Sequence, residues 1–178
     1  MEGVLPTDPL FLLIGPMGSG KSTVGRLLAA RLVLPCVDLD EAIVEASGKS
    51  IPVLFSEEGE AAFRDREAAM LQKLCGDGQG KVIATGGGVV LRAENRALLQ
   101  NIGYVIWLDA PPEVLASRTR GDANRPLLHN VDPLMKAKAL DSERRPYYAA
   151  CADFHVQTSC MGVQQTVDTI VAFAQTQE

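Results

Sequence analysis

The sequence has little of what several common kinds of site require. Its four cysteines show no C-x-x-C spacing, and neither of its two histidines has metal-ligand spacing, which argues against a zinc site or a redox pair. No apolar run approaches the roughly 18 residues that a membrane span needs. Acidic residues outnumber Lys and Arg by 22 to 17, and nucleic acids are held mainly by an excess of basic side chains. We therefore expect no membrane and no nucleic acid among the partners.

Nothing in the sequence divides the chain either, because it has no internal repeat, low-complexity tract or linker. Its 178 residues fit a single domain, residues 1–178, with a core that needs no disulfide. Residues 1–9 are acidic and contain proline, so we expect a tail rather than a secretory signal. Scattered thiols are typical of a reducing compartment. We expect a cytoplasmic monomer.

What the sequence does contain is a complete phosphate-binding pattern, G-x-x-x-x-G-K-[ST], from Gly15 to Ser22. An apolar run precedes it and a helical pattern follows it, as this motif requires. Gly15, Gly18 and Gly20 let successive backbone N–H groups point at one anion. We expect Lys21 to be exposed and to meet the β- and γ-phosphates, and the Ser22 hydroxyl to be a ligand for Mg²⁺. The motif predicts that the chain binds a nucleoside triphosphate.

Apolar runs that alternate with helical patterns predict the fold. Five short strands are expected, at residues 10–14, 35–37, 81–85, 104–108 and 154–157. Helices are expected after the glycine loop and at residues 57–74, 93–101, 112 onward, 132–150 and 163–174, and the chain is broken near Gly48 and Pro52. Because the strands are apolar on both faces, we predict an α/β fold whose parallel sheet is covered by helices on both faces.

Two further motifs follow predicted strands, where ligands gather in such a sheet. The first is Asp38-Leu39-Asp40. If it is extended, both carboxylates share one side, and one can serve a metal while the other meets a substrate hydroxyl. Asp40 could instead merely cap the next helix. The second motif, three glycines at 86–88, suits backbone contact with a ligand, although a plain loop is the alternative.

The order and spacing of these motifs resemble the shikimate kinase family. The similar stretch runs from about residue 10 to residue 152, and its motifs are the glycine loop, D-x-D, Phe63-Arg64 with a Glu three residues later, T-G-G-G, R-P-L-L, and an arginine four residues before a tyrosine. The resemblance implies a three-layer P-loop fold like that of nucleoside monophosphate kinases, with residues 120–131 as a mobile lid. It implies transfer of the γ-phosphoryl group of ATP to the 3-hydroxyl of shikimate, with Mg²⁺ as cofactor.

The resemblance also assigns site residues. For shikimate they are Asp40, Arg64, Gly86, Gly87, Gly88 and Arg144. For ATP they are Gly18, Ser19, Gly20, Lys21, Ser22, Thr23, Arg118 and Arg125. Lys21, Asp40 and Arg125 are the catalytic residues that it implies, and Mg²⁺ is expected near Ser22 and, through water, near Asp38.

The chemistry of arginine supports the roles of Arg64 and Arg144, because a guanidinium pairs bidentately with a carboxylate. Alternatives stay open at each position. Arg64 could simply pair with Glu67 on the same helix, and Arg145 could take the role given to Arg144. Another small-metabolite kinase with a glycine loop, such as one acting on gluconate, remains an alternative function. So does a non-catalytic nucleotide-binding relative, which would be expected to have lost a catalytic or anion-binding residue.

Overall fold

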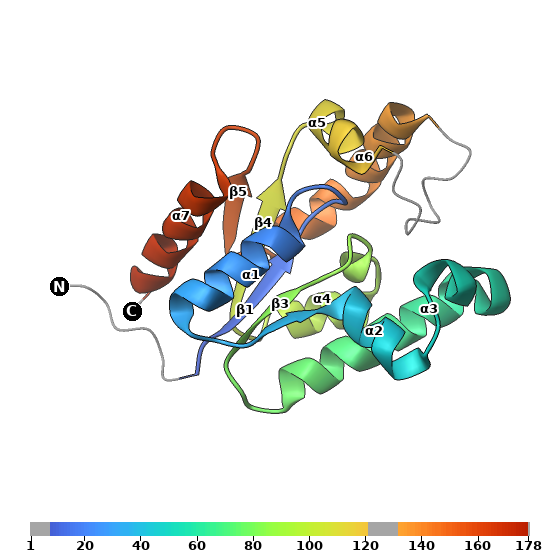
Figure 1. Cartoon of the computed structure of the whole chain (residues 1–178), viewed down its shortest axis with the longest axis horizontal. Coiled ribbons are helices and arrows are strands. Elements are labelled where there is room, and N and C mark those ends of the chain that lie inside the picture. Colours follow the sequence, from blue (N-terminus) through green and yellow to red (C-terminus); the bar gives the residue numbers. More distant parts are fainter. Residues whose placement is uncertain (1–7, 121–131, 178) are drawn as a thin grey trace.

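The computed structural model describes residues 8–120 and 132–177, and Figure 1 shows its sheet between two layers of helices. The strands are β1 (Leu10–Ile14), β2 (Cys36–Asp38), β3 (Lys81–Ala84), β4 (Tyr104–Asp109) and β5 (Phe154–Gln157). All neighbouring strands pair in parallel, in the order β2-β3-β1-β4-β5. The predicted five-stranded parallel sheet is confirmed, and β1, which leads into the glycine loop, lies at its centre.

Helices cover both faces of this sheet, as predicted. They are α1 (Lys21–Leu32), α2 (Leu39–Ser47), α3 (Ile51–Gly76), α4 (Ala93–Leu99), α5 (Pro112–Thr119), α6 (Pro133–Cys151) and α7 (Val163–Gln175), with a 3₁₀ turn, η1, at Val89–Leu91. The core beneath α1 and α7 is separate from the core beneath α2, α3, α4 and α6. In the described part of the chain, no helix combines the length and apolar character needed to cross a bilayer.

The central strand shows why the sequence is apolar without a break here. Phe11 and Leu13 point to the α1 and α7 side, whereas Leu12 and Ile14 point to the α3 and α6 side. All four side chains are fully buried. Because successive side chains of a strand alternate between faces, a sheet covered on both sides needs apolar residues at every position.

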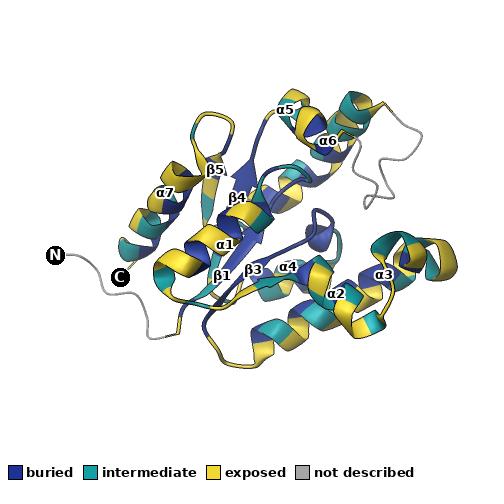
Figure 2. Ribbon diagram, viewed as in Figure 1, coloured by how far each residue is buried: buried dark blue, intermediate teal, exposed yellow. Residues whose placement is uncertain are grey.

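The two edge strands depart from that pattern (Figure 2). We expected the second strand to be buried at residues 35–37, but β2 begins at Cys36, which is exposed, and ends at Asp38. Strand β5 has the predicted bounds, yet His155 and Gln157 are exposed. A strand at the edge has a neighbour on one side only, and short-range sequence patterns carry no information on strand order.

The predicted breaks lie at the end of α2 and at the start of α3. Gly48 ends α2 in the left-handed conformation, with φ of 67°, and Pro52 occupies the first turn of α3, where its missing N–H is tolerated. Helix α3 is longer than predicted and is interrupted at Gly59, with φ of 84° and ψ of 168°. Of the expected tail, only Asp8 and Pro9 are described, and the carbonyl of Pro9 accepts a hydrogen bond from the N–H of Lys81 (3.1 Å).

Candidate active site

The glycine loop joins β1 to α1 in the conformation that the motif predicts. Gly15, Gly18 and Gly20 have φ of 140°, 82° and 96°, values that residues with a Cβ rarely adopt. A Cβ on Gly15 would also lie 2.1 Å from the carbonyl oxygen of Leu108. Helix α1 begins directly after the loop, at Lys21, so its positive dipole end faces the same space. This part of the chain is built to bind a phosphate group.

Lys21 differs from our expectation, because its side chain is buried rather than exposed, with 8% exposure. The ammonium donates hydrogen bonds to the carbonyl oxygens of Gly15 and Pro16, each at 2.8 Å. A buried charge needs hydrogen-bond partners, and the tight turn of the loop brings its own carbonyls within reach. Lys21 is therefore held in place at the loop.

The structure corrects our view of the D-x-D motif. Asp38 is the N-cap of α2, and its Oδ1 accepts from the backbone N–H groups of Asp40 (3.0 Å) and Glu41 (3.3 Å). The extended arrangement is therefore wrong, since Asp40 lies in the first helical turn. The alternative that Asp40 is the cap is also wrong. Aspartate is among the strongest N-cap residues, and the first of the two takes this position.

Asp38 also connects α2 to the glycine loop. Its other oxygen, Oδ2, accepts a hydrogen bond of 2.5 Å from the hydroxyl of Ser22. These are oxygen donors of the kind that Mg²⁺ prefers, and Mg²⁺ usually keeps several waters and phosphate oxygens as its remaining ligands. Among the described residues, no cluster of three or more His, Cys, Asp or Glu could hold a metal by itself. The Ser22 and Asp38 pair thus fits a Mg²⁺ ion that arrives with a nucleotide.

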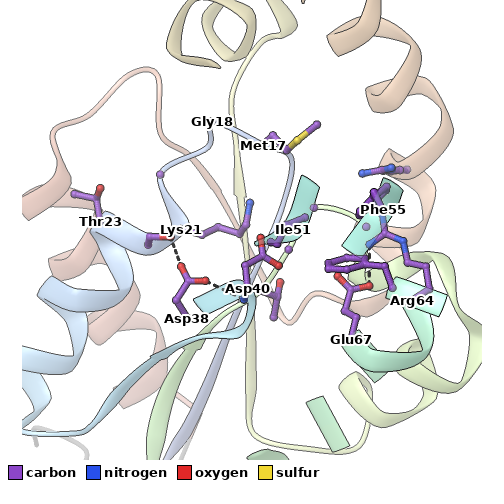
Figure 3. Close-up of a pocket in the computed structure, with 18 residues that line it drawn as sticks. Met17, Gly18, Lys21, Thr23, Asp38, Asp40, Ile51, Phe55, Arg64 and Glu67 are labelled. Carbon is purple, nitrogen blue, oxygen red and sulfur yellow. Dashed lines mark hydrogen bonds and ion pairs between the residues drawn. The ribbon is translucent and has the colours of Figure 1, made fainter. Parts of the chain in front are cut away.

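A cavity of about 250 Å³ opens beside the loop. It is lined by Met17, Gly18, Gly20, Lys21, Ser22, Thr23, Asp38, Asp40, Ile51, Phe55, Phe63, Arg64, Glu67, Thr85, Gly86, Gly87, Gly88 and Arg144. Figure 3 shows Lys21 and Asp40 in its middle, with Asp38 on one side and Arg64 with Glu67 on the other. Most residues that the sequence assigned to ATP and to shikimate therefore share one space.

The glycines at 86–88 line this cavity where β3 ends. A Cβ on Gly88 would lie 2.4 Å from a guanidinium nitrogen of Arg64, and one on Gly86 would lie 2.9 Å from Oε1 of Glu67. Since real Cβ atoms do not approach other atoms so closely, the absence of side chains is what lets both charged groups reach the cavity wall. The turn is more than a plain loop.

Arg64 pairs with Glu67, as one of the two interpretations of the sequence has it, and its role toward a ligand stays a prediction. Its Nη1 donates to Oε2 of Glu67 at 2.9 Å, and its Nη2 reaches Oε1 of Glu60 at 3.4 Å. The same guanidinium lines the cavity. Both Arg64 and Glu67 are buried, with 8% and 1% exposure, so the cavity wall holds a buried guanidinium fixed by a carboxyl group.

Glu67 is the buried carboxylate of this pair. Its Oε1 has no hydrogen-bond partner among the described residues. Burial raises the pKa of Glu67, the nearby Arg64 charge opposes that rise, and the charge of Asp40 adds to it. The structure thus places two carboxyl groups, those of Glu67 and Asp40, at the same glycine turn.

The two adjacent arginines of α6 have different surroundings. Arg144 lines the cavity, is 4% exposed, and its Nε has no hydrogen-bond partner in the described part of the chain. Arg145 instead contacts both oxygens of the buried Asp109, each at 3.0 Å, and pairs with Asp141. Its guanidinium lies over the ring of Trp107. The geometry therefore favours Arg144 for a ligand in the cavity.

Arg118 lies beside the glycine loop but does not line the cavity. Its Nη1 donates to the carbonyl oxygen of Gly18 (3.1 Å) and to the hydroxyl of Thr158 (3.3 Å). Thr158 in turn donates to the carbonyl oxygen of Ser19 (3.2 Å). Ser19 itself is fully buried. Arg125 and the rest of residues 121–131 lie outside the described residues, so the lid and its arginine stay predictions.

Several cavity residues were missed by the sequence analysis. Met17, Ile51, Phe55 and Phe63 form an apolar wall, and of these only Phe63 was singled out, as part of the Phe63-Arg64 motif. The hydroxyl of Thr85 donates to the carbonyl oxygen of Leu13 (2.8 Å). Apolar residues that line a ligand site carry the same sequence pattern as apolar residues of the core.

Comparisons with known proteins give one family for both the sequence and the structure of this chain. A family model described as shikimate kinase matches residues 17–175. The chain is 47% identical over 162 residues to a shikimate kinase of Symbiobacterium thermophilum, covering 90% of this chain and 92% of that protein. A shikimate kinase of Neisseria gonorrhoeae is also 47% identical, over 90% of this chain and 92% of its own length. A solved shikimate kinase from Acinetobacter baumannii in complex with shikimate superposes with a TM-score of 0.93 and 37% identity, over 97% and 96% of the two chains.

Proposed function

The chain belongs to the shikimate kinase family, and on this premise we propose that it transfers the γ-phosphoryl group of ATP to the 3-hydroxyl of shikimate. The products are ADP and shikimate 3-phosphate. The observation that carries the proposal is the cavity itself, which has a phosphate-binding loop and Lys21 together with two buried guanidinium groups. Such a space suits a small acid whose hydroxyl must meet a triphosphate.

The phosphate side of the cavity does mostly positioning and charge neutralisation, which is what phosphoryl transfer asks of a protein. We propose that the N–H groups of the loop, from Gly18 to Thr23, hold the β-phosphate. The Lys21 ammonium is hydrogen-bonded to the carbonyl oxygens of the loop. It would interact with the β- and γ-phosphates when a nucleotide binds. Ser22, and Asp38 through water, would hold Mg²⁺, which would neutralise the negative charge of the phosphates.

The part of the cavity away from the glycine loop would bind the acceptor, shikimate. We propose that Arg64 and Arg144 bind the carboxylate of shikimate, since charged hydrogen bonds to a guanidinium are the strong ones. The backbone of residues 86–88 would lie along the ring. Asp40, between these groups and the loop (Figure 3), would orient the attacking hydroxyl or take its proton.

Two further arginines complete the proposal by resemblance to the family. Arg118, fixed by the carbonyl of Gly18 and by Thr158, would pack on the adenine. Arg125 would stabilise the charge of the transferred group. Four free cysteines agree with a cytoplasmic enzyme, and we propose that it acts as a monomer.

A coupled ADP-release assay at fixed MgATP tests this function directly. Shikimate, quinate and gluconate are compared as acceptors, since all three are hydroxy acids with one carboxylate. We expect kcat/KM for shikimate to exceed that for gluconate by at least about a hundredfold, because a site built on paired hydrogen bonds strongly rejects a ligand that leaves them unmade. Equal or faster turnover of gluconate would identify the other metabolite kinase instead.

A further inference from the structure

Tyr148 makes a contact that the proposed reaction does not yet use. It lies one helical turn after Arg144 on α6 and is 1% exposed. Its hydroxyl donates a hydrogen bond of 2.5 Å to the carbonyl oxygen of Gly87. Helix α6 and the glycine turn are far apart in the sequence, and this bond ties them together.

The surroundings of Tyr148 make the hydroxyl a fixed donor. Its ring lies 5.8 Å from the ring of Trp107, centroid to centroid, so packing holds it in place. Burial raises the pKa of Tyr148 far above its usual value, and the neighbouring Arg144 opposes only part of that rise. The hydroxyl therefore keeps its proton at neutral pH, and it is the donor in its hydrogen bond with the Gly87 carbonyl.

Tyr148 does not itself line the cavity, but both groups that it adjoins do. A Cβ on Gly87 would lie 3.5 Å from Nη1 of Arg144 and 3.4 Å from the backbone nitrogen of Met17. The backbone of Gly87 thus faces the guanidinium and the glycine loop across a gap that a single side-chain carbon would fill. A small rotation of this peptide would change the width of the cavity between them.

Helix α4 holds the following turn in the same way. The side chain of Asn95 donates to the carbonyl oxygen of Val89 (2.9 Å), and Nη1 of Arg96 donates to that of Val90 (2.8 Å). Those two bonds fix η1 from outside the cavity. Tyr148, by contrast, binds one of the glycines themselves, through the carbonyl oxygen of Gly87.

We propose that Tyr148 is a positioning residue for the acceptor: its hydroxyl sets the backbone of Gly87 relative to Arg144 and thereby the affinity for the acid. The inference rests on the proposed function, which makes Gly87 and Arg144 part of the shikimate site. A positioning role differs measurably from a role in core packing alone. Loss of a hydroxyl that only stabilised the core would not change the affinity for one substrate more than for the other.

Tyr148→Phe tests the proposal, since it keeps the ring and removes only the hydroxyl, which donates to Gly87 and also interacts with Arg144. We expect the KM and the Kd for shikimate to rise about fivefold to tenfold, as for the loss of one buried hydrogen bond. The KM for ATP should stay within about twofold of the wild-type value, because the loop contacts of Lys21 are untouched. The readouts are steady-state kinetics with each substrate varied, and calorimetry with shikimate.

Thr166→Val is the matched control. The Thr166 hydroxyl donates to the carbonyl oxygen of Gly162 (3.0 Å) and the residue is 1% exposed, but it lies on α7, on the other face of the sheet. This variant loses a buried hydroxyl–carbonyl bond far from the cavity. We expect a fall in the urea midpoint like that of Tyr148→Phe, with both KM values unchanged.

A pair of non-natural residues covers the case in which Tyr148→Phe does not fold. 4-Aminophenylalanine at position 148 keeps a donor, and 4-methylphenylalanine has the same shape without one. The amino variant should restore shikimate affinity and the methyl variant should not. Equal shikimate affinity in the two, or an unchanged shikimate KM in a folded Tyr148→Phe, overturns the inference. If wild-type protein does not phosphorylate shikimate in the same assay, the proposed function fails instead.

Discussion

Asp38 and Asp40 are separated by one residue, yet the proposed function gives them different roles, and this difference can be measured. Asp38→Asn keeps a good N-cap, so α2 should persist, while the oxygen bonded to Ser22 loses its charge. We expect a higher Mg²⁺ requirement and recovery of kcat at high Mg²⁺. Asp40→Asn should lower kcat by about a hundredfold or more, with MgATP binding retained.

Titration of Mg²⁺ and of each substrate distinguishes the two variants. If both changes only raised the KM for ATP, the division of labour between the two carboxylates would be wrong.

The adjacent arginines of α6 provide a matched pair of substitutions. Arg144→Ala should weaken shikimate binding by about tenfold to a hundredfold, as expected for a lost charged hydrogen bond, with ATP affinity nearly unchanged. Arg145→Ala should leave shikimate affinity intact and lower the free energy of unfolding by about 1–3 kcal/mol, because the buried Asp109 loses its cation. Calorimetry and urea unfolding on both variants check this, and the reverse pattern would shift the assignment to Arg145.

Single residues also show where sequence reasoning stops. Motif spacing found Arg64, Arg144 and Asp40, because those positions follow fixed offsets. It gave Tyr148 only as the tyrosine four residues after Arg144, and it gave no sign of Thr158 or of the partners of these two residues, which lie 61 and 139 residues away along the chain. Contacts of that kind depend on the packing of elements, which no local pattern encodes.

At the scale of elements, the glycine turn after β3 leads to a prediction about space rather than charge. A Cβ on Gly88 would lie within 2.4–2.5 Å of three guanidinium atoms of Arg64. In Gly88→Ala the guanidinium must therefore move, and we expect shikimate affinity to fall at least about tenfold while the KM for ATP stays the same. The measurement is again kinetics with each substrate varied.

Gly76→Ala serves as the control for that variant, because a Cβ there would have nothing within 4 Å. It should be neutral or slightly stabilising, since alanine favours the helix. Unchanged shikimate affinity in Gly88→Ala would show that Arg64 is not held as the structure has it.

Most elements followed from periodicity, and the exceptions have local causes. Strands β1 and β5 have the predicted bounds. The D-x-D stretch was misread because an aspartate after a strand can either extend the strand or cap a helix, and here Asp38 caps. Turn η1 at Val89–Leu91 was missed because a stretch of three residues shows no period.

At the scale of the whole molecule, the buried Glu67 makes global stability depend on pH. Its pKa in the folded protein is raised above the usual 4.5, so the folded state binds this proton more tightly than the unfolded chain does. The resulting stabilisation is present below pH 4.5 and is lost as the pH rises through the raised value. Glu67→Gln cannot titrate and lacks this dependence.

Urea unfolding of both proteins between about pH 4 and pH 8 measures that difference. We expect the wild type to lose stability relative to Glu67→Gln as the pH rises. A relative gain would mean that the Arg64 charge outweighs burial and that the pKa is lowered.

Fold class was predictable for the whole chain because five apolar runs alternate with helices, but strand order was not. Placing β2 and β5 at the edges explains why Cys36 and His155 do not belong to the core. The same order places β1 between β3 and β4, so that the glycine loop and the turn at 86–88 meet at one edge. The cavity results from that arrangement as much as from any motif.

The central claim is that one cavity joins a triphosphate to a particular hydroxyl of an acid, and identification of the product tests it most directly. Wild-type protein is incubated with MgATP and shikimate, and the product is analysed by mass spectrometry and by ³¹P–¹H correlated NMR, with Lys21→Ala as the inactive control. We predict a single phosphorylated acid, with phosphorus coupled to the proton at carbon 3, in amounts equal to the ADP released. Release of free phosphate without a phosphorylated acid, phosphorylation at another hydroxyl, or full product formation by Lys21→Ala would contradict it.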